Sequence, residues 1–123
     1  MKALVIDDVA MSQLIVKRTL ERSGYEVLTA SSGNEALEYF KNHDDLKVVV
    51  CDMMMPDISG IDLIKKVKTL EKYSTKLPVC ILLTAVQEVE TLQEAKREGF
   101  VEVMIKPMEP DVLLGIINGY AEA

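Results

Sequence analysis

Five polar side chains in this chain lie at or just beyond the ends of short apolar runs, where their chemistry can be combined. They are three carboxylates, one hydroxyl and one ammonium group: Asp7, Asp8, Asp52, Thr84 and Lys106. Three carboxylates in one cleft repel one another, and at an effective dielectric constant of about 20 two charges ~4 Å apart cost roughly 4 kcal/mol. A proton or a divalent cation relieves this repulsion. Because the set contains only oxygen ligands, without His or Cys nearby, it favours Mg²⁺.

Asp52 is the candidate nucleophile of such a site, because a carboxylate can form an aspartyl phosphate. A cation, the Lys106 ammonium group and the Thr84 hydroxyl around one carboxylate provide what phosphoryl transfer requires. A single Asp after a strand more often serves as a helix cap or a turn residue. The adjacent pair Asp7–Asp8 argues for more than capping, because a second acid adds repulsion that a cap does not need. The combined pattern of all five groups at strand ends therefore favours a functional site.

The elements that must bring these side chains together alternate between strand-like and helix-like segments, which is typical of a parallel sheet covered on both faces. Strands are predicted at 2–6, 26–30, 47–51, 78–83 and 101–105. Helices are predicted at 9–23, 33–43, 60–73, 87–98 and 110–121. The carboxyl ends of parallel strands share one edge, and open α/β sheets bind ligands at that edge. We therefore expect the five groups to converge there.

Local signals support several of the helix boundaries. Ser32 and Glu35 have the spacing of a capping box, and Ser59 suits the N-cap of the third predicted helix. Gly99 is expected to end the fourth helix, and Pro110 suits the first position of the fifth. The charged side chains of the third and fourth helices are expected to form solvated faces. These residues are Lys65, Lys66, Lys68, Lys72, Lys76, Glu88, Glu90, Glu94 and Glu98.

Length and composition exclude several classes of protein. The 123 residues suit one domain spanning 1–123, and the hydrophobic fraction of 49% excludes a disordered chain. The net charge of −6 argues against a nucleic-acid-binding surface. No apolar run approaches the ~20 residues of a membrane span, and no secretory segment follows Met1. We expect a cytoplasmic protein with no membrane insertion and no direct nucleic-acid contact, in which Cys51 and Cys80 are buried thiols.

The residues that carry this chemistry occur in an order that resembles a known family. They are the acidic pair 7–8, the segment 52–60 (DMMMPDISG), Thr84–Ala85 and Lys106–Pro107. Together they resemble the receiver domain of bacterial response regulators, especially the single-domain chemotaxis type, and the resemblance covers essentially the whole chain. It implies a flavodoxin-like α/β fold, doubly wound as (βα)5, whose parallel five-stranded sheet has the order 2-1-3-4-5.

The resemblance implies a role in a two-component phosphorelay, with Asp52 as the phosphoacceptor. A sensor histidine kinase or a phosphotransfer protein would supply the phosphoryl group in a Mg²⁺-dependent reaction. Asp8, Asp52 and the backbone carbonyl of Met54 would bind the Mg²⁺ directly, while Asp7 would act through water. The chain would then be a switch and not an enzyme, apart from its own phosphorylation and dephosphorylation.

The resemblance also links Lys106 and Thr84 to a protein-binding surface. Lys106 would bind the phosphoryl group, and Thr84 would turn inward to donate a hydrogen bond to it, moving the loop that follows. A new dianion requires such partners. A downstream protein, which the sequence does not identify, would then bind the face formed by 87–98, 101–105 and 110–121. A monomer or a weak dimer is expected.

Four positions depart from the family's pattern or vary within it. Val103 stands where the family usually has Tyr or Phe, three residues before the lysine, so the aromatic part of the switch is absent or replaced. Phe100 stands where a small residue is usual, and we expect it in the core. Met54 and Val86 occupy positions that flank the phosphoryl group in relatives. Because both are apolar, we expect no ordered attacking water and a long-lived aspartyl phosphate.

Two other functions stay open at this point. A haloacid-dehalogenase-type phosphatase also forms an aspartyl phosphate after an apolar strand. It requires a second Asp as general acid two residues after the nucleophile, where this chain has Met54. A degenerate receiver would bind partners without being phosphorylated. The intact acidic set argues against that function, while Val103 leaves room for it.

Overall fold

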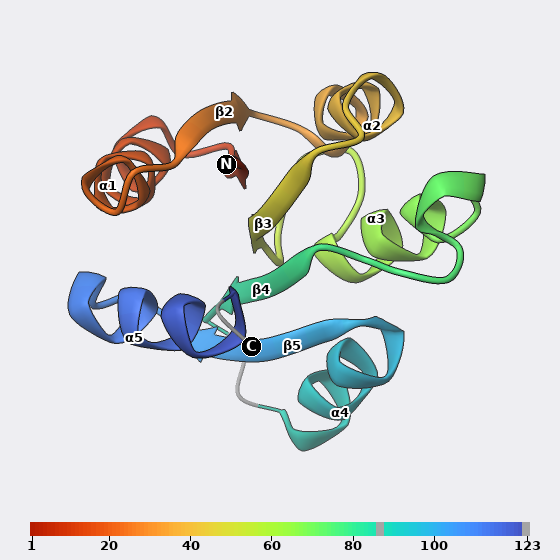
Figure 1. Ribbon diagram of the computed structural model, residues 1–123. Helices are drawn as coiled ribbons and strands as arrows, with labels where there is room; N and C mark the ends of the chain where they lie inside the picture. Colours follow the sequence, from red (N-terminus) through yellow and green to blue (C-terminus); the bar gives the residue numbers. More distant parts are fainter. Residues whose placement is uncertain (86–87, 122–123) are drawn as a thin grey trace.

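A parallel sheet forms the centre of the structure, a computed structural model in which residues 1–85 and 88–121 are described (Figure 1). Its strands are β1 (Lys2–Ile6), β2 (Glu26–Ala30), β3 (Leu46–Asp52), β4 (Val79–Thr84) and β5 (Phe100–Ile105). They lie in the order β2-β1-β3-β4-β5, and every neighbouring pair is parallel. The predicted strand order is therefore confirmed.

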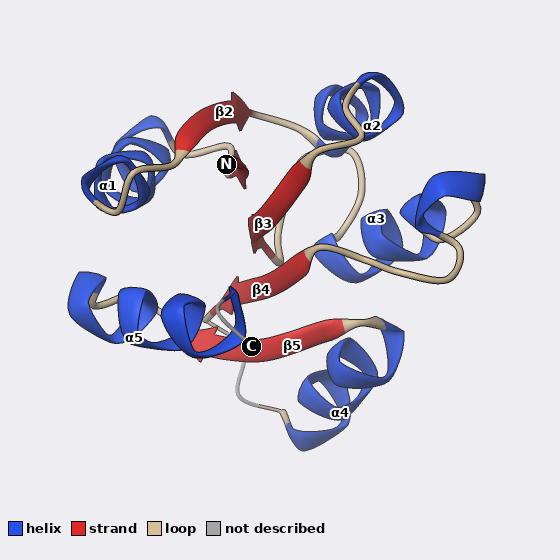
Figure 2. Cartoon of the chain, viewed as in Figure 1, coloured by secondary structure: helices blue, strands red, loops and turns tan. Residues whose placement is uncertain are grey.

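The α-helices of the described residues cover both faces of the sheet, as Figure 2 shows. They are α1 (Ala10–Arg22), α2 (Gly33–Asn42), α3 (Gly60–Val67), α4 (Val89–Glu98) and α5 (Pro110–Ala121). α1 and α5 lie on one face, and α2, α3 and α4 lie on the other (Figure 1). This confirms the predicted doubly wound α/β fold. None of the described helices combines the length and the apolar character that crossing a membrane requires.

Two apolar cores, one on each face of the sheet, hold these layers together. On β4, Leu82 contributes to the core beneath α2, α3 and α4, whereas Ile81 and Leu83 contribute to the core beneath α1 and α5. Phe40 of α2 and Leu113 of α5 are completely buried in these two cores. Burying a side chain of this size stabilises the folded state by about 2 kcal/mol. Buried apolar side chains therefore hold the helices against both faces of the sheet.

Capping residues confirm several predicted helix boundaries. Ser32 Oγ accepts a hydrogen bond from the Glu35 N–H at 3.2 Å, at the start of α2. Ser59 Oγ accepts one from the Asp62 N–H at 3.1 Å, at the start of α3. Gly99 ends α4 with a φ of 134°, a conformation that residues with a Cβ rarely adopt.

The helix predicted at 60–73 is shorter than expected. α3 ends at Val67, and a separate 3₁₀ turn covers Glu71–Tyr73. The N–H groups of Thr69 and Leu70 donate to carbonyls three residues earlier, at 3.1 and 3.0 Å. These shorter-range hydrogen bonds tighten the last turn and replace the bonds that would continue an α-helix.

Other boundaries differ from the predictions by one or two residues. β3 includes Asp52 and β4 includes Thr84, so these polar residues end their strands instead of following them. β5 begins at Phe100, which is buried in the core as predicted. The predicted helix start at residue 87 lies outside the described residues. Cys51 and Cys80 are buried free thiols, as predicted.

Ion pairs join α3 to α4 along the line where the two helices meet. Lys65 Nζ lies 3.3 Å from Glu94 Oε2, and Lys68 Nζ lies 2.7 Å from Glu98 Oε1. All four side chains are at least a quarter exposed. The charged faces of these helices are therefore in contact with water, as predicted, but part of each face is also paired with the other.

Candidate functional site

The carboxyl ends of β1 and β3 place the acidic residues side by side. Ile6 is paired with Cys51 in the parallel register, so Asp7 and Asp52 follow at the same level on neighbouring strands. Carboxylate oxygens of Asp7, Asp8 and Asp52 all lie within 4.8 Å of one another. The structure thus brings together the three acids that were singled out in the sequence.

The three carboxylates differ in their exposure to water. Asp7 and Asp52 are only 2% and 6% exposed, whereas Asp8 is exposed. Asp7 Oδ1 accepts a hydrogen bond from the Val9 N–H at 2.9 Å, but Asp7 Oδ2 accepts none from the described part of the chain. The pKa of Asp7 is raised, mainly because burial removes water from its charged form. The neighbouring charges of Asp52 and Asp8 raise this pKa further, against the Val9 hydrogen bond and the attraction of Lys106.

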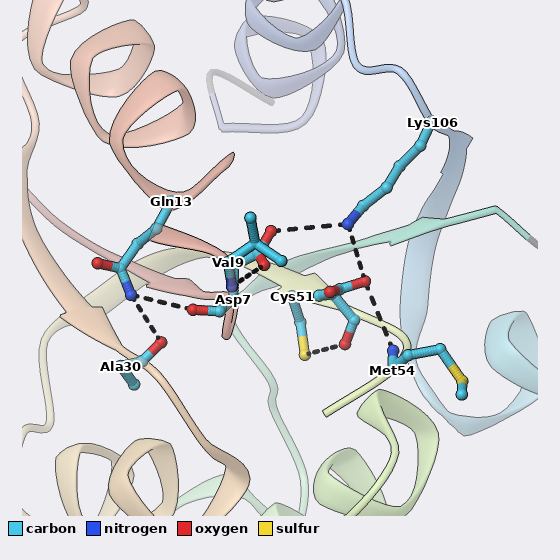
Figure 3. A network of polar contacts seen from close by, with 8 residues as sticks. Asp7, Val9, Gln13, Ala30, Cys51, Met54 and Lys106 are labelled. Atoms are coloured by element: carbon cyan, nitrogen blue, oxygen red, sulfur yellow. Dashed lines mark hydrogen bonds and ion pairs between the residues drawn. The ribbon is translucent and has the colours of Figure 1, made fainter. Parts of the chain in front are cut away.

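Lys106 brings a positive charge to the acids. Its Nζ lies 3.2 Å from Asp52 Oδ1 and 3.7 Å from Asp7 Oδ2. Figure 3 shows this side chain reaching from the end of β5 toward Asp7. The backbone N–H of Lys106 donates to the Thr84 carbonyl at 2.9 Å, which fixes the chain beyond β5 against the end of β4. One ammonium group does not neutralise three ionised carboxylates, so the cluster keeps an excess of negative charge.

Thr84 and Met54 lie at the same edge of the sheet. Thr84 is 1% exposed and ends β4, one residue after Leu83, which is paired with Asp52. The Met54 N–H lies 3.5 Å from Asp52 Oδ1, at the long limit for a hydrogen bond, and the Met54 side chain is 67% exposed. The loop after β3 therefore passes close to the Asp52 carboxylate. Val86, the other predicted flanking residue, lies outside the described residues.

The position that lacks the usual aromatic residue is on β5. Val103 is half-buried there, opposite Leu82, and packs against the core beneath α4. A shallow hollow between α4 and β5 has this valine in its wall. The lining residues are Val89, Leu92, Gln93, Lys96 and Val103.

Two residues whose contacts the sequence did not predict support the acidic loops. Gln13 Nε2 donates to the carbonyls of Asp7 and Ala30, both at 3.1 Å, and Figure 3 shows the amide between them. The Asp57 carboxylate accepts hydrogen bonds from the first two N–H groups of α2, at 3.0 and 2.8 Å. The contacts of Gln13 with Ala30 and of Asp57 with α2 join segments far apart in the chain, so no local pattern in the sequence indicates them.

The donor set fits a hard divalent cation. The ligand atoms that the acids offer are carboxylate oxygens, and Mg²⁺ is bound in proteins through carboxylates, carbonyls and water. The buried Asp7 Oδ2 is a further sign, because a buried oxygen without a hydrogen-bond donor costs stability unless a cation or a water molecule meets it. The residues present are therefore suited to holding Mg²⁺.

Comparison with known proteins identifies the family. The family model of the response regulator receiver domain matches residues 3–118. Chemotaxis protein CheY1 of Helicobacter pylori is 38% identical over 114 residues, which cover 92% of this chain and 90% of that protein.

Solved structures give the same result. A response regulator receiver domain protein from Clostridium thermocellum superposes with a TM-score of 0.86 at 35% identity, covering 98% of this chain and 94% of that one. A response regulator protein from Burkholderia pseudomallei, solved with a phosphorylated aspartic acid, a calcium ion and citrate, has a TM-score of 0.82 at 26% identity. That comparison covers 98% of this chain and 68% of the other. The chain therefore belongs to the family of response regulator receiver domains.

Proposed function

We propose that this chain is a two-component signalling switch controlled by phosphorylation of Asp52. Family membership gives the general class, a receiver domain of two-component or chemotaxis signalling. The observation that carries the finer proposal is the cluster itself, in which three carboxylates lie within 4.8 Å of one another and Lys106 Nζ lies 3.2 Å from Asp52 Oδ1. We further infer a cytoplasmic monomer or weak dimer in which residues 1–123 act as one domain.

In the proposed reaction, a carboxylate oxygen of Asp52 attacks the phosphorus of a phosphohistidine on a sensor kinase or phosphotransfer protein. An O–P bond forms, the N–P bond breaks, and the leaving imidazole nitrogen takes up a proton from water. Lys106, already beside Asp52, meets the negative charge that arrives with the phosphoryl group, and Thr84 donates a hydrogen bond to one of its oxygens. Bound Mg²⁺ would neutralise part of the charge on the phosphoryl oxygens.

Asp8, Asp52 and the backbone carbonyl of Met54 are the proposed direct ligands of the Mg²⁺, with Asp7 acting through water. The short distances among the carboxylates support this set, as does the Met54 N–H close to Asp52, which brings this stretch of loop to the site. The related Burkholderia pseudomallei protein carries a phosphorylated aspartic acid and a divalent cation, in that case calcium. We propose the same combination of acyl phosphate and divalent cation for this chain.

The proposed output is a change in protein binding at the face formed by α4, β5 and α5. Apolar side chains are available there, because Val89 is 65% exposed and Val112 is 49% exposed. A shift of the active form from 1% to 99% requires that phosphorylation favour it by about 5.5 kcal/mol. Thr84 and Lys106 are the residues through which the phosphoryl group would supply this preference, and Val103 leaves the switch without its usual aromatic side chain.

The other two functions have weaker support. A phosphatase of the dehalogenase type would require a general acid where Met54 presents an exposed thioether side chain. Receivers of the chemotaxis type are signalling switches, which agrees with the absence of an acid at position 54. A receiver that is never phosphorylated would have no use for a cluster of three carboxylates in which the buried Asp7 Oδ2 accepts no hydrogen bond from the described residues.

The decisive test is incubation with Mg²⁺ and a small acyl-phosphate donor, followed by mass spectrometry of the intact protein. We expect a mass gain of one phosphate in the unchanged protein and none in Asp52→Asn or when the cation is chelated. Multiple turnover of a phosphomonoester would instead indicate a phosphatase. No mass gain under any condition would indicate a degenerate receiver and would contradict the proposal.

A further inference from the structure

The loop that follows β3 is fastened to the start of α2 by one carboxylate. Asp57 Oδ1 accepts a hydrogen bond from the Gly33 N–H at 3.0 Å, and Asp57 Oδ2 accepts one from the Asn34 N–H at 2.8 Å. Asp57 Oδ1 also accepts from the Ile58 N–H at 3.0 Å, within the loop itself. The pKa of Asp57 is lowered, mainly by the Gly33 and Asn34 amides, as expected for an anion at a helix N-terminus.

Apolar packing holds the same two segments together. A Cβ added at Gly33 would overlap the Ile58 side chain, so the loop approaches the helix start as closely as a glycine allows. Ile58 packs against the core that includes α2 and α3. A hydrogen bond also joins the two ends of the loop, because the Gly60 N–H donates to the Met53 carbonyl at 2.9 Å. The position of the loop is therefore set by contacts with α2 as well as by its own ends.

The segment that joins β2 to α2, residues 30–34, is also connected to the loop that carries Asp7 and Asp8. The Asp7 N–H donates to the carbonyl of Ala30, the first residue of this segment, at 3.0 Å. Gln13 Nε2 donates to the carbonyls of Asp7 and Ala30, each at 3.1 Å, and lies 3.4 Å from Ser31 Oγ (Figure 3). The segment 30–34 thus contacts both of the loops that supply ligands in the proposed Mg²⁺ site.

We propose that the segment 30–34 is a common anchor for the two acidic loops, and that Asp57 is a positioning residue for cation binding. Asp57 does not reach the cation. It holds the loop so that the Met54 carbonyl stays next to Asp52. Asp57 lies three residues after Met54 and is connected to it by Met55 and Pro56. Residues that orient ligands in this way are worth roughly tenfold or more in metal affinity. This inference rests on the proposed function.

A purely structural role would make Asp57 only a second cap of α2. Ser32 already caps this helix through the Glu35 N–H at 3.2 Å, and within the described residues its hydroxyl makes no hydrogen bond to either acidic loop. Ser32→Ala is therefore the matched control, because it removes a hydrogen bond from the same helix end without releasing the loop. The comparison separates the loss of a helix cap from the loss of an anchor.

The experiment is a calorimetric titration of the full chain with MgCl₂, for the unchanged protein and for Asp57→Ala, Asp57→Asn and Ser32→Ala. We expect about tenfold weaker binding for Asp57→Ala. Asp57→Asn keeps one acceptor oxygen, so its Mg²⁺ affinity should lie between those of Asp57→Ala and the unchanged protein. The same variant provides the test if Asp57→Ala does not fold. Ser32→Ala should bind within about twofold of the unchanged protein, since it leaves the loop attached.

Hydrogen exchange without the cation provides a second readout. The amides of residues 53–59 should exchange faster in Asp57→Ala and be unchanged in Ser32→Ala. Equal Mg²⁺ affinity in Asp57→Ala and the unchanged protein, or equal weakening in Ser32→Ala, would overturn the inference while leaving the proposed function intact. If the unchanged protein itself neither binds Mg²⁺ nor accepts a phosphate, the proposed function fails and this inference fails with it.

Discussion

Charged residues are arranged in opposite ways in two regions of this molecule. Where α3 meets α4, Lys65 faces Glu94 and Lys68 faces Glu98, one cation to each anion, and all four side chains are partly exposed. At the carboxyl edge of the sheet, three acids lie together and Lys106 pairs with two of them, Asp7 and Asp52. The Asp7 carboxylate is 2% exposed, and one of its oxygens accepts no hydrogen bond from the described residues. In the first region each negative charge is balanced by a positive one, whereas in the second region negative charge remains in excess.

The pKa values in the two regions move in opposite directions. The hydrogen bond from Lys68 lowers the pKa of Glu98, so ionising this carboxyl favours the folded state and the benefit is lost as the pH falls. Burial raises the pKa of Asp7, so ionising that carboxyl disfavours the folded state at neutral pH. Sites built for binding commonly reduce stability in this way. The contrast indicates that the acidic cluster is arranged for a ligand and the helix contact for the fold.

The largest expected effect comes from removing the positive charge of the acidic cluster. Lys106→Ala should lower the free energy of unfolding by about 2–3 kcal/mol without Mg²⁺, because it leaves two mostly buried carboxylates without their ion pair. The estimate is below the usual range for buried pairs, since Lys106 is 28% exposed. Urea unfolding in the presence of a chelator measures it. Saturating Mg²⁺ should restore part of the loss, and a variant as stable as the parent would remove the contrast between the two regions.

The next effect concerns the lifetime of the phosphorylated state. Met54 offers no polar group to an attacking water, and its side chain is exposed beside Asp52. Met54→Asn should accelerate the loss of phosphate about tenfold, less than the roughly 10²–10⁴-fold of a general acid or base, because an amide orients the water without taking its proton. The time course of phosphate release from the loaded protein measures the rate. Release that is no slower in the parent than in the variant would refute the role of the apolar side chain; Met55→Leu is the matched control.

A smaller effect of opposite sign is expected at Asp7. Asp7→Asn keeps the oxygen that accepts from Val9 and replaces Oδ2, which accepts no hydrogen bond from the described residues, with an NH₂ group. Because the variant no longer buries this negative charge, it should be about 1 kcal/mol more stable without Mg²⁺ at pH 7, even though it loses the long ion pair with Lys106. In the parent, the folded state keeps the Asp7 proton to higher pH than the unfolded state, whose value is about 3.8. The penalty is therefore full above the folded pKa and disappears below the unfolded pKa. Urea unfolding should show the gain at pH 7 shrinking as the pH falls toward 3.8, and a variant less stable than the parent at pH 7 would contradict the prediction.

Much of the fold and of the acidic cluster could be predicted because both depend on regular geometry. Parallel strands end at one edge, so Asp7, Asp52 and Thr84 are brought to the same place by strand spacing alone. The predicted end of α3, residue 73, was wrong because the apolar spacing of the sequence continues past Val67, where the helix ends. Tyr73 in the following 3₁₀ turn is 5% exposed, so the chain continues to bury apolar side chains after the α-helix has ended.

The supporting contacts could not be predicted because they join distant segments. Asp57 meets Gly33 across 24 residues, and Lys65 meets Glu94 across 29. Such pairs depend on how the β3–α3 loop and the helices pack. From the sequence alone, a charged residue of this kind is predicted to face water. Strand ends are determined by a repeating geometry, whereas these contacts are determined only by the finished packing.

The smallest expected effect lies in the region with balanced charges and completes the contrast. Lys65→Ala removes an ion pair whose two side chains are 43% and 42% exposed, and it should change the free energy of unfolding by less than about 0.5 kcal/mol. The difference should vanish at high salt, because exposed charges are screened. The effect of Lys106→Ala should persist there, since the carboxylates that it leaves behind are mostly buried. Urea unfolding of both variants at low and high salt is the measurement. Equal losses with equal salt dependence would mean that the two regions do not differ in the way their charges are used.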